Sequence, residues 1–313
     1  MALTVGVDVG GTKIAAGVVS ESGEILESQR RDTPARDPRG TSEAIVALVQ
    51  DLRLRHDVAA VGVGAAGYVD ADRSTVLFAP NLAWRDEPLK ATLEGQVGVP
   101  VVVENDANAA AWGEFRFGAA FDVDDLVMVA VGTGIGGGVV LDGQLFRGHF
   151  GIAAEFGHIR AVPGGHVCGC GNYGCWEQYA SGKALVRSVR EVAQTSSPRA
   201  ESVLDKAGGD PDAITGQMIT TAATEGDRLA VEAFEELGRW LGEGIASLVA
   251  AFDPGVIVIG GGVSEAGELL MAPARAAFDR QLPGRGHRPE PQLRLAQLAN
   301  TAGMIGVADL ARH

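Results

Sequence analysis

The sequence predicts an α/β protein in which one supersecondary pattern occurs twice. Short apolar runs that suit strands alternate with helical stretches along the 313 residues, and this alternation is typical of α/β layers with partly parallel sheets. A strand, a glycine turn and a second strand occupy residues 3–19. The same pattern returns about 125 residues further on, which indicates an internal duplication. At about 150 residues per domain, the length also favours two domains.

The first copy of the pattern opens the chain. Apolar runs on both sides of a glycine turn predict a β-hairpin, and apolar residues at helical spacing predict the helix that follows. The expected order is strands at 3–9, 13–19 and 24–31, a helix at 41–51, strands at 58–63 and 100–103, and an alanine-rich helix at 107–115.

The second copy begins with another glycine hairpin. Asp142-Gly143 is a typical tight turn between its later strands, and the polar, breaker-rich stretch 195–216 suits a surface excursion of loops or short helices. The expected elements are strands at 125–131, 136–141 and 144–146, a long helix at 229–252, a strand at 256–259 and a helix that begins near Glu265.

Composition limits the class of protein. Lys and Arg number 26 against 40 Asp and Glu, for a net charge of −14, which disfavours nucleic acid as a partner. No run reaches the ~18–20 apolar residues of a membrane helix, and the N-terminus lacks the basic start of a signal peptide. Cys168, Cys170 and Cys175 lie within eight residues, a pattern that suits a metal site in a reducing compartment. We therefore expect a cytoplasmic enzyme or binding protein.

The 44 glycines are about twice the usual ~7% share, which leads us to expect many positive-φ turns or close approaches to a ligand. Residues 62–67 and 132–137 match G-x-G-x-x-G, but a turn or strand follows each instead of the helix that a Rossmann site needs. Gly182-Lys183 is followed by Ala184, so a Walker A loop is absent as well. The glycine turns must serve another kind of site.

The turn after the first strand could bind phosphate. A carboxylate at a strand end followed by glycines and a hydroxyl can seat Mg²⁺ and phosphate oxygens; the alternative is a tight hairpin with a solvated aspartate. A second such turn follows residue 131, and two glycine hairpins could grip one polyphosphate chain. A third precedes a helix start, which favours anions. The candidate ATP and magnesium residues are Asp8, Gly10, Gly11, Thr12, Lys13, Thr133, Gly134, Gly261 and Gly262.

Asn105 and Asp106 lie where a strand is expected to end and a helix to begin. One interpretation is a helix N-cap, a position that Asn and Asp suit well. The other is a carboxylate at the carboxyl edge of a sheet, where α/β proteins bind ligands. In that case Asp106 could accept a proton from a substrate hydroxyl, and Asn105 could fix a neighbouring hydroxyl.

The three cysteines follow His158. A Cys₃His set is common at structural zinc sites, although His166 is a competing ligand and buried free thiols are an alternative. A zinc-ordered loop would present Glu155 and Glu177, which flank the cluster in the sequence.

Together these motifs resemble the ROK family of sugar kinases and sugar-responsive repressors, and within that family they look like those of bacterial ATP-dependent glucokinases. The resemblance runs from residue 4 to about residue 306, in the family's order. It rests on DVGGTK, ENDANAAAWGE, GTGIGGGVV, EFGH, CGCGNYGCWEQYASG and DPGVIVIGGGVS.

The resemblance implies a bilobal actin/hexokinase-like (ribonuclease H-like) fold with duplicated glycine-turn hairpins. It implies a smaller N-terminal α/β domain at 1–107, completed by a C-terminal helix at about 300–313. A larger α/β domain at 108–299 would carry the zinc knuckle. Homodimers or homotetramers are common in the family.

The resemblance also implies roles for the candidate residues. Asp106 is the general base, and the zinc ligands are His158, Cys168, Cys170 and Cys175. The sugar-binding residues are Gly67, Asn105, Asp106, Glu155, His158 and Glu177.

The implied reaction transfers phosphate from MgATP to the 6-hydroxyl of glucose. The alternatives are an N-acetylmannosamine or N-acetylglucosamine kinase of the same family and a sugar-sensing regulator. The regulators carry a DNA-binding segment ahead of the kinase-like body, and since the first hairpin begins by residue 4 we expect a kinase and not a regulator. An actin- or chaperone-like ATPase would lack the cysteine knuckle. The sequence leaves open whether ATP or polyphosphate is the donor.

Overall fold

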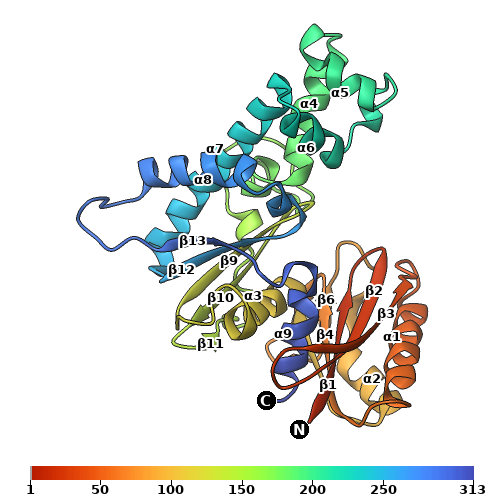
Figure 1. Ribbon diagram of the computed structural model, residues 1–313. Coiled ribbons are helices and arrows are strands. Elements are labelled where there is room, and N and C mark those ends of the chain that lie inside the picture. The colour runs from red at the N-terminus through yellow and green to blue at the C-terminus, as the bar shows by residue number, and fades with distance from the viewer. Residues whose placement is uncertain (1) are drawn as a thin grey trace. The chain divides into compact units, whose positions relative to one another are not determined.

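The computed structural model describes residues 2–313 as a chain of two compact units (Figure 1). The first unit holds the chain up to Leu126, together with Gly137–Ala154 and Ala296–His313. The second unit holds Val127–Gly136 and Glu155–Leu295. The domain boundaries expected after residues 107 and 299 stay a prediction.

The first sheet has five strands in the order β3-β2-β1-β4-β8. Its strands are β1 (Leu3–Val9), β2 (Lys13–Val19), β3 (Ile25–Asp32), β4 (Val58–Ala65) and β8 (Val101–Asn105). The hairpin strands pair antiparallel, whereas β1, β4 and β8 pair parallel. The carboxyl ends of three neighbouring strands therefore meet at one edge of this sheet.

The second sheet repeats this order as β11-β10-β9-β12-β13. Its strands are β9 (Leu126–Val131), β10 (Ile135–Leu141), β11 (Gln144–Leu145), β12 (Val256–Gly260) and β13 (Gln292–Leu295). Again a hairpin arm is antiparallel, and the last two strands are parallel. The predicted duplication of glycine-turn hairpins is confirmed.

A small three-stranded sheet was not predicted from the sequence. It is formed by β5 (Tyr68–Val69), β6 (Val76–Phe78) and β7 (Arg85–Glu87). Strands of two or three residues are too short to show a hydrophobic period, and their antiparallel pairing depends on partners that the local sequence does not reveal.

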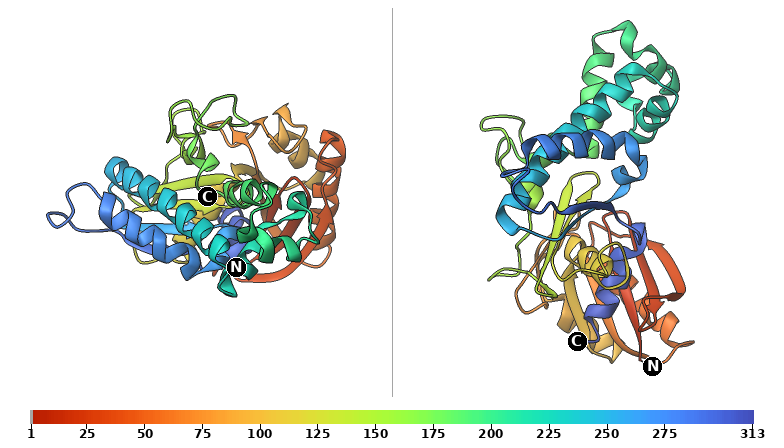
Figure 2. Two further views of the ribbon diagram at one scale, coloured as in Figure 1. Left: turned by 90° about the horizontal axis from the view of Figure 1, so that it is seen from above. Right: turned by 60° about the vertical axis from the view of Figure 1, so that its left-hand side comes forward.

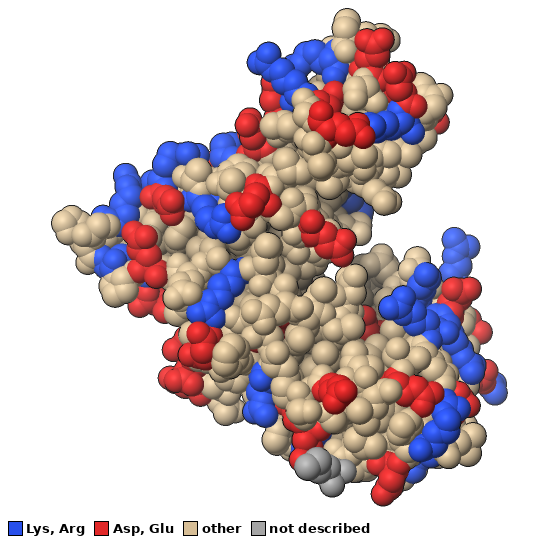
Figure 3. All heavy atoms as spheres, in the orientation of Figure 1, with Lys and Arg blue, Asp and Glu red and all other residues tan. Residues whose placement is uncertain are grey.

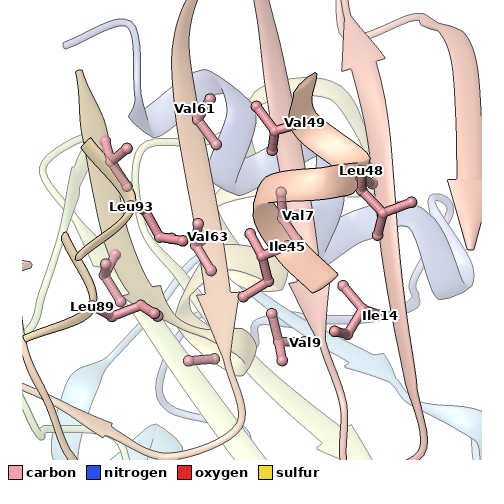
Figure 4. Packing of buried hydrophobic residues seen from close by; sticks show 14 of the residues in the cluster. Val7, Val9, Ile14, Ile45, Leu48, Val49, Val61, Val63, Leu89 and Leu93 are labelled. Atoms are coloured by element: carbon pink, nitrogen blue, oxygen red, sulfur yellow. The ribbon is translucent and has the colours of Figure 1, made fainter. Parts of the chain in front are cut away.

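The core of the first unit lies between its five-stranded sheet and two helices (Figure 4). Val7 and Val63 from the sheet pack with Ile45 and Leu48 of α1 and with Leu93 of α2. All five side chains are almost inaccessible to solvent. The helices of this unit are α1 (Pro38–Arg53), α2 (Leu89–Val97), α3 (Asp106–Phe117) and α9 (Ala302–Leu310).

The C-terminal helix α9 packs unusually close to the sheet and to α3 because glycines line its contacts. A Cβ atom on Gly6 would lie 2.0 Å from the Met304 carbonyl oxygen, and one on Gly62 would lie 1.9 Å from that of Val307. On the helix itself, Gly306 meets the carbonyl oxygen of Ala109 in the same way. These glycines serve helix packing, so the expectation that the glycine excess serves mainly turns and ligands was too narrow.

Helices dominate the second unit, where the long helix α7 lies against α8 (Figure 2). A Cβ on Gly242 of α7 would lie 2.1 Å from the Ala274 oxygen of α8, so glycine lets the two helices approach closely. The helix expected to begin near Glu265 is α8, which begins at Glu268 after a 3₁₀ turn formed by Gly262–Ala266. The helices are α4 (Gly182–Gln194), α5 (Glu201–Lys206), α6 (Gly216–Thr224), α7 (Arg228–Phe252) and α8 (Glu268–Gln281).

Acidic and basic side chains occur on both units over the face shown in Figure 3. Among the described residues, no helix has the length and apolar character that a membrane crossing requires.

Candidate active site

The predicted carboxylates of the first unit lie at the carboxyl edge of its sheet. Asp8 pairs in register with Gly64 of β4, and Gly64 pairs with Glu104 of β8. Asn105 ends β8 and Asp106 begins α3. The fold thus brings Asp8 and Asp106 to the same edge of the sheet, at the ends of two strands that β4 separates, where α/β proteins bind their ligands.

Asn105 joins this edge to the loop after β4. Its side-chain oxygen accepts the Asn108 N–H at 2.9 Å, so it is the N-cap of α3. Its amide group donates to the Gly67 carbonyl oxygen at 3.1 Å. The N-cap interpretation therefore holds for Asn105, whereas Oδ1 of Asp106 accepts the Ala107 N–H at 2.9 Å.

Asp106 has the electrostatics of a proton acceptor. Burial raises its pKa, and the nearby Asp8 carboxylate raises it further, to about 6. Burial also raises the pKa of Asp8. A general base works best when its pKa lies near the working pH, and an unperturbed aspartate has a pKa of about 3.9.

The glycine turn of residues 10–13 follows β1 directly. A backbone hydrogen bond from the Gly10 N–H to the Lys13 carbonyl oxygen, at 3.0 Å, closes the turn. Thr33 holds the turn from outside by donating its hydroxyl to the Gly10 oxygen at 2.8 Å. The Thr12 and Lys13 side chains are exposed, which leaves a hydroxyl and an ammonium group beside Asp8.

A cavity of about 820 Å³ lies wholly within the second unit. Its walls include Thr133 and Gly262 of the predicted phosphate turns. Gly134 and Gly261 are absent from the lining, and Gly261 (φ +82°) packs instead against the Val131 carbonyl. The volume is within the 300–1,000 Å³ range typical of small-molecule sites. The remaining lining residues are Gly132, Gly182, Lys183, Val186, Arg187, Arg190, Glu191, Gln194, Asp212, Gly216 and Val263.

Helix α4 forms one wall of this cavity and was missed by the sequence analysis. The Gly182 N–H donates to the Gly132 oxygen at 2.8 Å, which fixes the helix start to the glycine turn. Lys183 follows on the wall, and no ion pair with it is found among the described residues. Arg190 is already engaged, because it donates to the Ile214 oxygen at 2.7 Å. The polar sequence of α4 did not indicate that this helix would line a cavity.

The four predicted metal ligands come together. The ligand atoms of His158, Cys168, Cys170 and Cys175 all lie within 4.8 Å of one another. Cys168 Sγ is 3.7 Å from His158 Nδ1, and Cys170 Sγ is 3.6 Å from Cys175 Sγ. Tetrahedral zinc with Zn–S bonds of about 2.3 Å separates its ligand atoms by about 3.5–3.8 Å. The donor set and its spacing therefore fit a structural zinc ion.

The competing ligand His166 lies elsewhere. Its ring packs on Tyr179 with centroids 5.3 Å apart, and its backbone N–H donates to the Tyr179 hydroxyl at 3.0 Å. This arrangement selects His158 from the two histidines that the sequence left open.

Two short 3₁₀ helices carry the carboxylates that flank the cysteine cluster. Glu155 directly precedes Phe156–His158, and the His158 N–H donates to the Glu155 oxygen at 3.1 Å. Glu177 lies in Trp176–Gln178, and its Oε1 is 3.1 Å from Cys168 Sγ. The other Glu177 carboxylate oxygen lies against Gly134, where a Cβ would approach it to 2.3 Å.

The predicted sugar residues thus fall in two groups. Gly67, Asn105 and Asp106 belong to the first unit. Glu155, His158 and Glu177 belong to the second, beside the metal cluster.

Two sheets of equal strand order, each with a glycine hairpin, define the actin/hexokinase-like fold class. The family model described as "ROK family" matches residues 4–313. The chain belongs to the ROK family.

Individual relatives agree with this assignment. The glucokinase of Streptomyces coelicolor is 52% identical over 313 residues, covering 100% of this chain and 98% of the relative. A ROK family glucokinase from Streptomyces griseus, solved with glucose and AMPPNP, is 55% identical with a TM-score of 0.91 and covers 99% of both chains. The ROK hexokinase of Thermus thermophilus is 36% identical with a TM-score of 0.82, over 99% of this chain and 98% of that one.

Proposed function

We propose that the chain is a hexokinase-type phosphotransferase that transfers the terminal phosphate of ATP to the 6-hydroxyl of glucose. Full-length identity of 52% to a glucokinase and 55% to a relative solved with glucose and AMPPNP supports this substrate pair. The observation that carries the proposal within this chain is Asp106, a partly buried carboxylate at the carboxyl edge of the sheet whose pKa is raised to about 6.

Asp106 acts as the general base. In its ionised form it accepts the proton of the 6-hydroxyl as the oxygen attacks the phosphoryl group. Asn105 donates to the Gly67 oxygen, so its amide is held in one orientation from which it can bind a neighbouring sugar hydroxyl. Glu155, His158 and Glu177 complete the sugar-binding set. Because phosphoryl transfer involves little covalent chemistry for the protein, positioning these groups is the main task.

The glycine turns bind the phosphates. Backbone N–H groups of Gly10, Gly11 and Gly134 can approach phosphate oxygens closely, since no Cβ intervenes. Asp8 lies at a strand end where it can hold Mg²⁺ through water, and the ion neutralises charge on the transferred group. The cavity lined by Thr133, Lys183 and Gly262 is large enough for the nucleoside.

His158, Cys168, Cys170 and Cys175 would hold zinc in a structural role, because four protein ligands leave no open position for a catalytic water. The ion would tie the segment that carries His158 to the segment that carries Glu177. Three closely spaced thiols would stay reduced in a cytoplasmic setting, which is where we place the enzyme.

The test is a panel of sugars with purified chain and MgATP, with product identified as well as ADP release. We expect glucose 6-phosphate and the highest kcat/KM for glucose, with mannose and glucosamine weaker. Sites built to bind a hydroxyl discriminate by about 10⁴-fold against analogues that leave polar groups unpaired. Faster turnover of N-acetylmannosamine than of glucose would overturn the proposed substrate.

A further inference from the structure

Glu104 is a buried carboxylate for which the reaction itself has no use. It lies in β8 immediately before Asn105, and its side chain is fully buried. Burying a charge costs several kcal/mol unless the charge is paired and hydrogen-bonded. The partners of Glu104 therefore indicate what its charge accomplishes.

One carboxylate oxygen of Glu104 holds the residues on both sides of Asp106. Its Oε1 accepts the backbone N–H of Asn105 at 2.8 Å. The same oxygen accepts the side-chain amide of Asn108 at 3.2 Å. Asn108 in turn donates its backbone N–H to the Asn105 side chain at 2.9 Å. The end of β8 and the first turn of α3 are thus fixed around one acceptor.

The other oxygen of Glu104 faces two cations. Arg147 Nε lies 2.7 Å from Oε2, and Arg73 Nε lies 3.2 Å from it. Arg147 is itself only 9% exposed. Its two remaining nitrogens donate to the Asp70 and Ala71 carbonyl oxygens, both at 2.8 Å. Glu104 is therefore cross-linked to the turn that follows β5.

That turn is held rigidly by its own contacts. The Asp70 carboxylate accepts the Ser74 N–H at 2.8 Å, the Ser74 hydroxyl at 2.7 Å and the Thr75 N–H at 3.1 Å. Asn105 reaches the start of the same segment through the Gly67 oxygen. Links through Arg147, Arg73 and Asn105 thus join the strand end to the 67–75 segment.

We propose that Glu104 is a positioning residue for phosphoryl transfer: its carboxylate fixes Asn105 and the first turn of α3, and thereby sets where the Asp106 carboxylate meets the sugar hydroxyl. The inference rests on the proposed function. Its physical basis is the steep dependence of such reactions on geometry, because a misplacement of about 1 Å can cost about 10²-fold in rate. Arg147 and Arg73 compensate the buried charge and anchor it to the 67–75 segment.

Glu114 of α3, the helix that Asp106 begins, provides a matched control. It is also fully buried, and its carboxylate also accepts backbone N–H groups, those of Ala119, Gln297 and Leu298. Within residues 2–313, none of its hydrogen bonds reaches Asn105 or Asp106. Substitution of either glutamate should lower stability, but only substitution of Glu104 should disturb the base.

The experiment compares Glu104→Met, Glu104→Gln, Glu114→Met and Glu114→Gln with the wild-type chain. Thermal unfolding is measured first, and kinetics are then measured at a temperature where every variant is folded. We expect Glu104→Met to lower kcat at least 10-fold and raise the glucose KM, with the ATP KM within twofold of wild type. Glu104→Gln keeps an acceptor oxygen and should retain more activity. The Glu114 variants should lose stability but keep kcat within twofold.

Wild-type kcat in folded Glu104→Met would overturn the proposal, as would an equal loss of kcat in Glu114→Met. If Glu104→Met does not fold, Glu104→Asp takes its place: it keeps the charge but withdraws the acceptor by one methylene, so the same fall in kcat is expected and normal kcat contradicts the inference. An inactive wild-type chain would instead refute the proposed function, and the positioning role with it.

Discussion

The two glycine hairpins share a scaffold but carry different chemistry. In the first sheet the strand before the turn ends in Asp8-Val9, and in the second it ends in Ala130-Val131. Asp8 adds a carboxylate beside Asp106, whereas the second turn has no acid at the matching place and opens onto a cavity with Lys183 on its wall. One duplicated backbone thus supports an acidic edge in one unit and a nucleoside-sized cavity in the other. The residues placed on the scaffold, and not the scaffold, determine the function.

The largest expected effect concerns the acidic edge. Asp106→Asn should lower kcat by about 10²–10⁴-fold because the amide cannot accept the proton. Glucose affinity should change far less, since the amide keeps the size of the side chain. Steady-state kinetics and calorimetric glucose binding measure both quantities.

Asp309→Asn is the control for this substitution. Asp309 is also buried, but it accepts from the Trp112 indole and from Arg312 within the α9 contacts. It should cost stability and leave kcat nearly unchanged. Turnover close to wild type in Asp106→Asn would remove Asp106 from the mechanism.

Asp106→Asn should lower activity but raise the stability of the fold at high pH. A carboxyl whose pKa is raised in the folded state stabilises the fold below its unfolded pKa, and that contribution is lost as pH rises through about 6. At pH 8 the wild type therefore carries an unfavourable, partly desolvated charge that Asp106→Asn lacks. We expect the variant to be more stable at pH 8 by on the order of 2 kcal/mol, with little difference at pH 4. Denaturant unfolding at both values measures this, and a variant that is less stable at pH 8 would contradict the assigned burial.

Disruption of the metal cluster should have a smaller effect on the enzyme than loss of the base. One Zn²⁺ per chain is expected by metal analysis after purification without chelator. Cys170→Ser should weaken zinc retention and lower glucose affinity by about 10-fold, because the segments with His158 and Glu177 lose their common tie. ATP affinity should stay close to that of the wild type. A chain that contains no zinc yet binds glucose normally would refute this role.

Sequence reasoning recovered the hairpins and the ligand cluster because their signals are local. Cys168, Cys170 and Cys175 lie within eight residues, and Asn105-Asp106 follows its strand directly. The Arg147 contact with Glu104 could not be predicted, since it joins residues 43 positions apart through a buried ion pair. The packing roles of Gly62 and Gly306 could not be predicted for the same reason: both glycines serve contacts of α9, which comes from the far end of the chain.

Substitutions in the glycine turn at residues 260–262 should have a smaller effect than loss of the base or of the metal cluster. Gly261 has φ +82°, and a Cβ there would lie 2.5 Å from the Val131 oxygen, whereas a Cβ on Gly262 meets nothing within 4 Å. Gly261→Ala should therefore cost at least about 1 kcal/mol of unfolding free energy. Gly262→Ala is the matched control and should cost almost none, although it narrows the cavity and should raise the ATP KM. Equal stability of the two variants in thermal unfolding would show that the turn is not strained as described.

The pH dependence of kcat/KM for glucose tests the acidic edge most directly. Because Asp106 must be ionised to act as base, activity should fall as pH drops below about 6 in the wild type. Asp8→Asn removes the neighbouring charge, so the pKa of Asp106 should fall and the acid limb of the residual activity should move to lower pH. This result would show that the group which titrates in catalysis is the one beside Asp8. An acid limb at the same pH in both enzymes would contradict the assignment of Asp106 as the base.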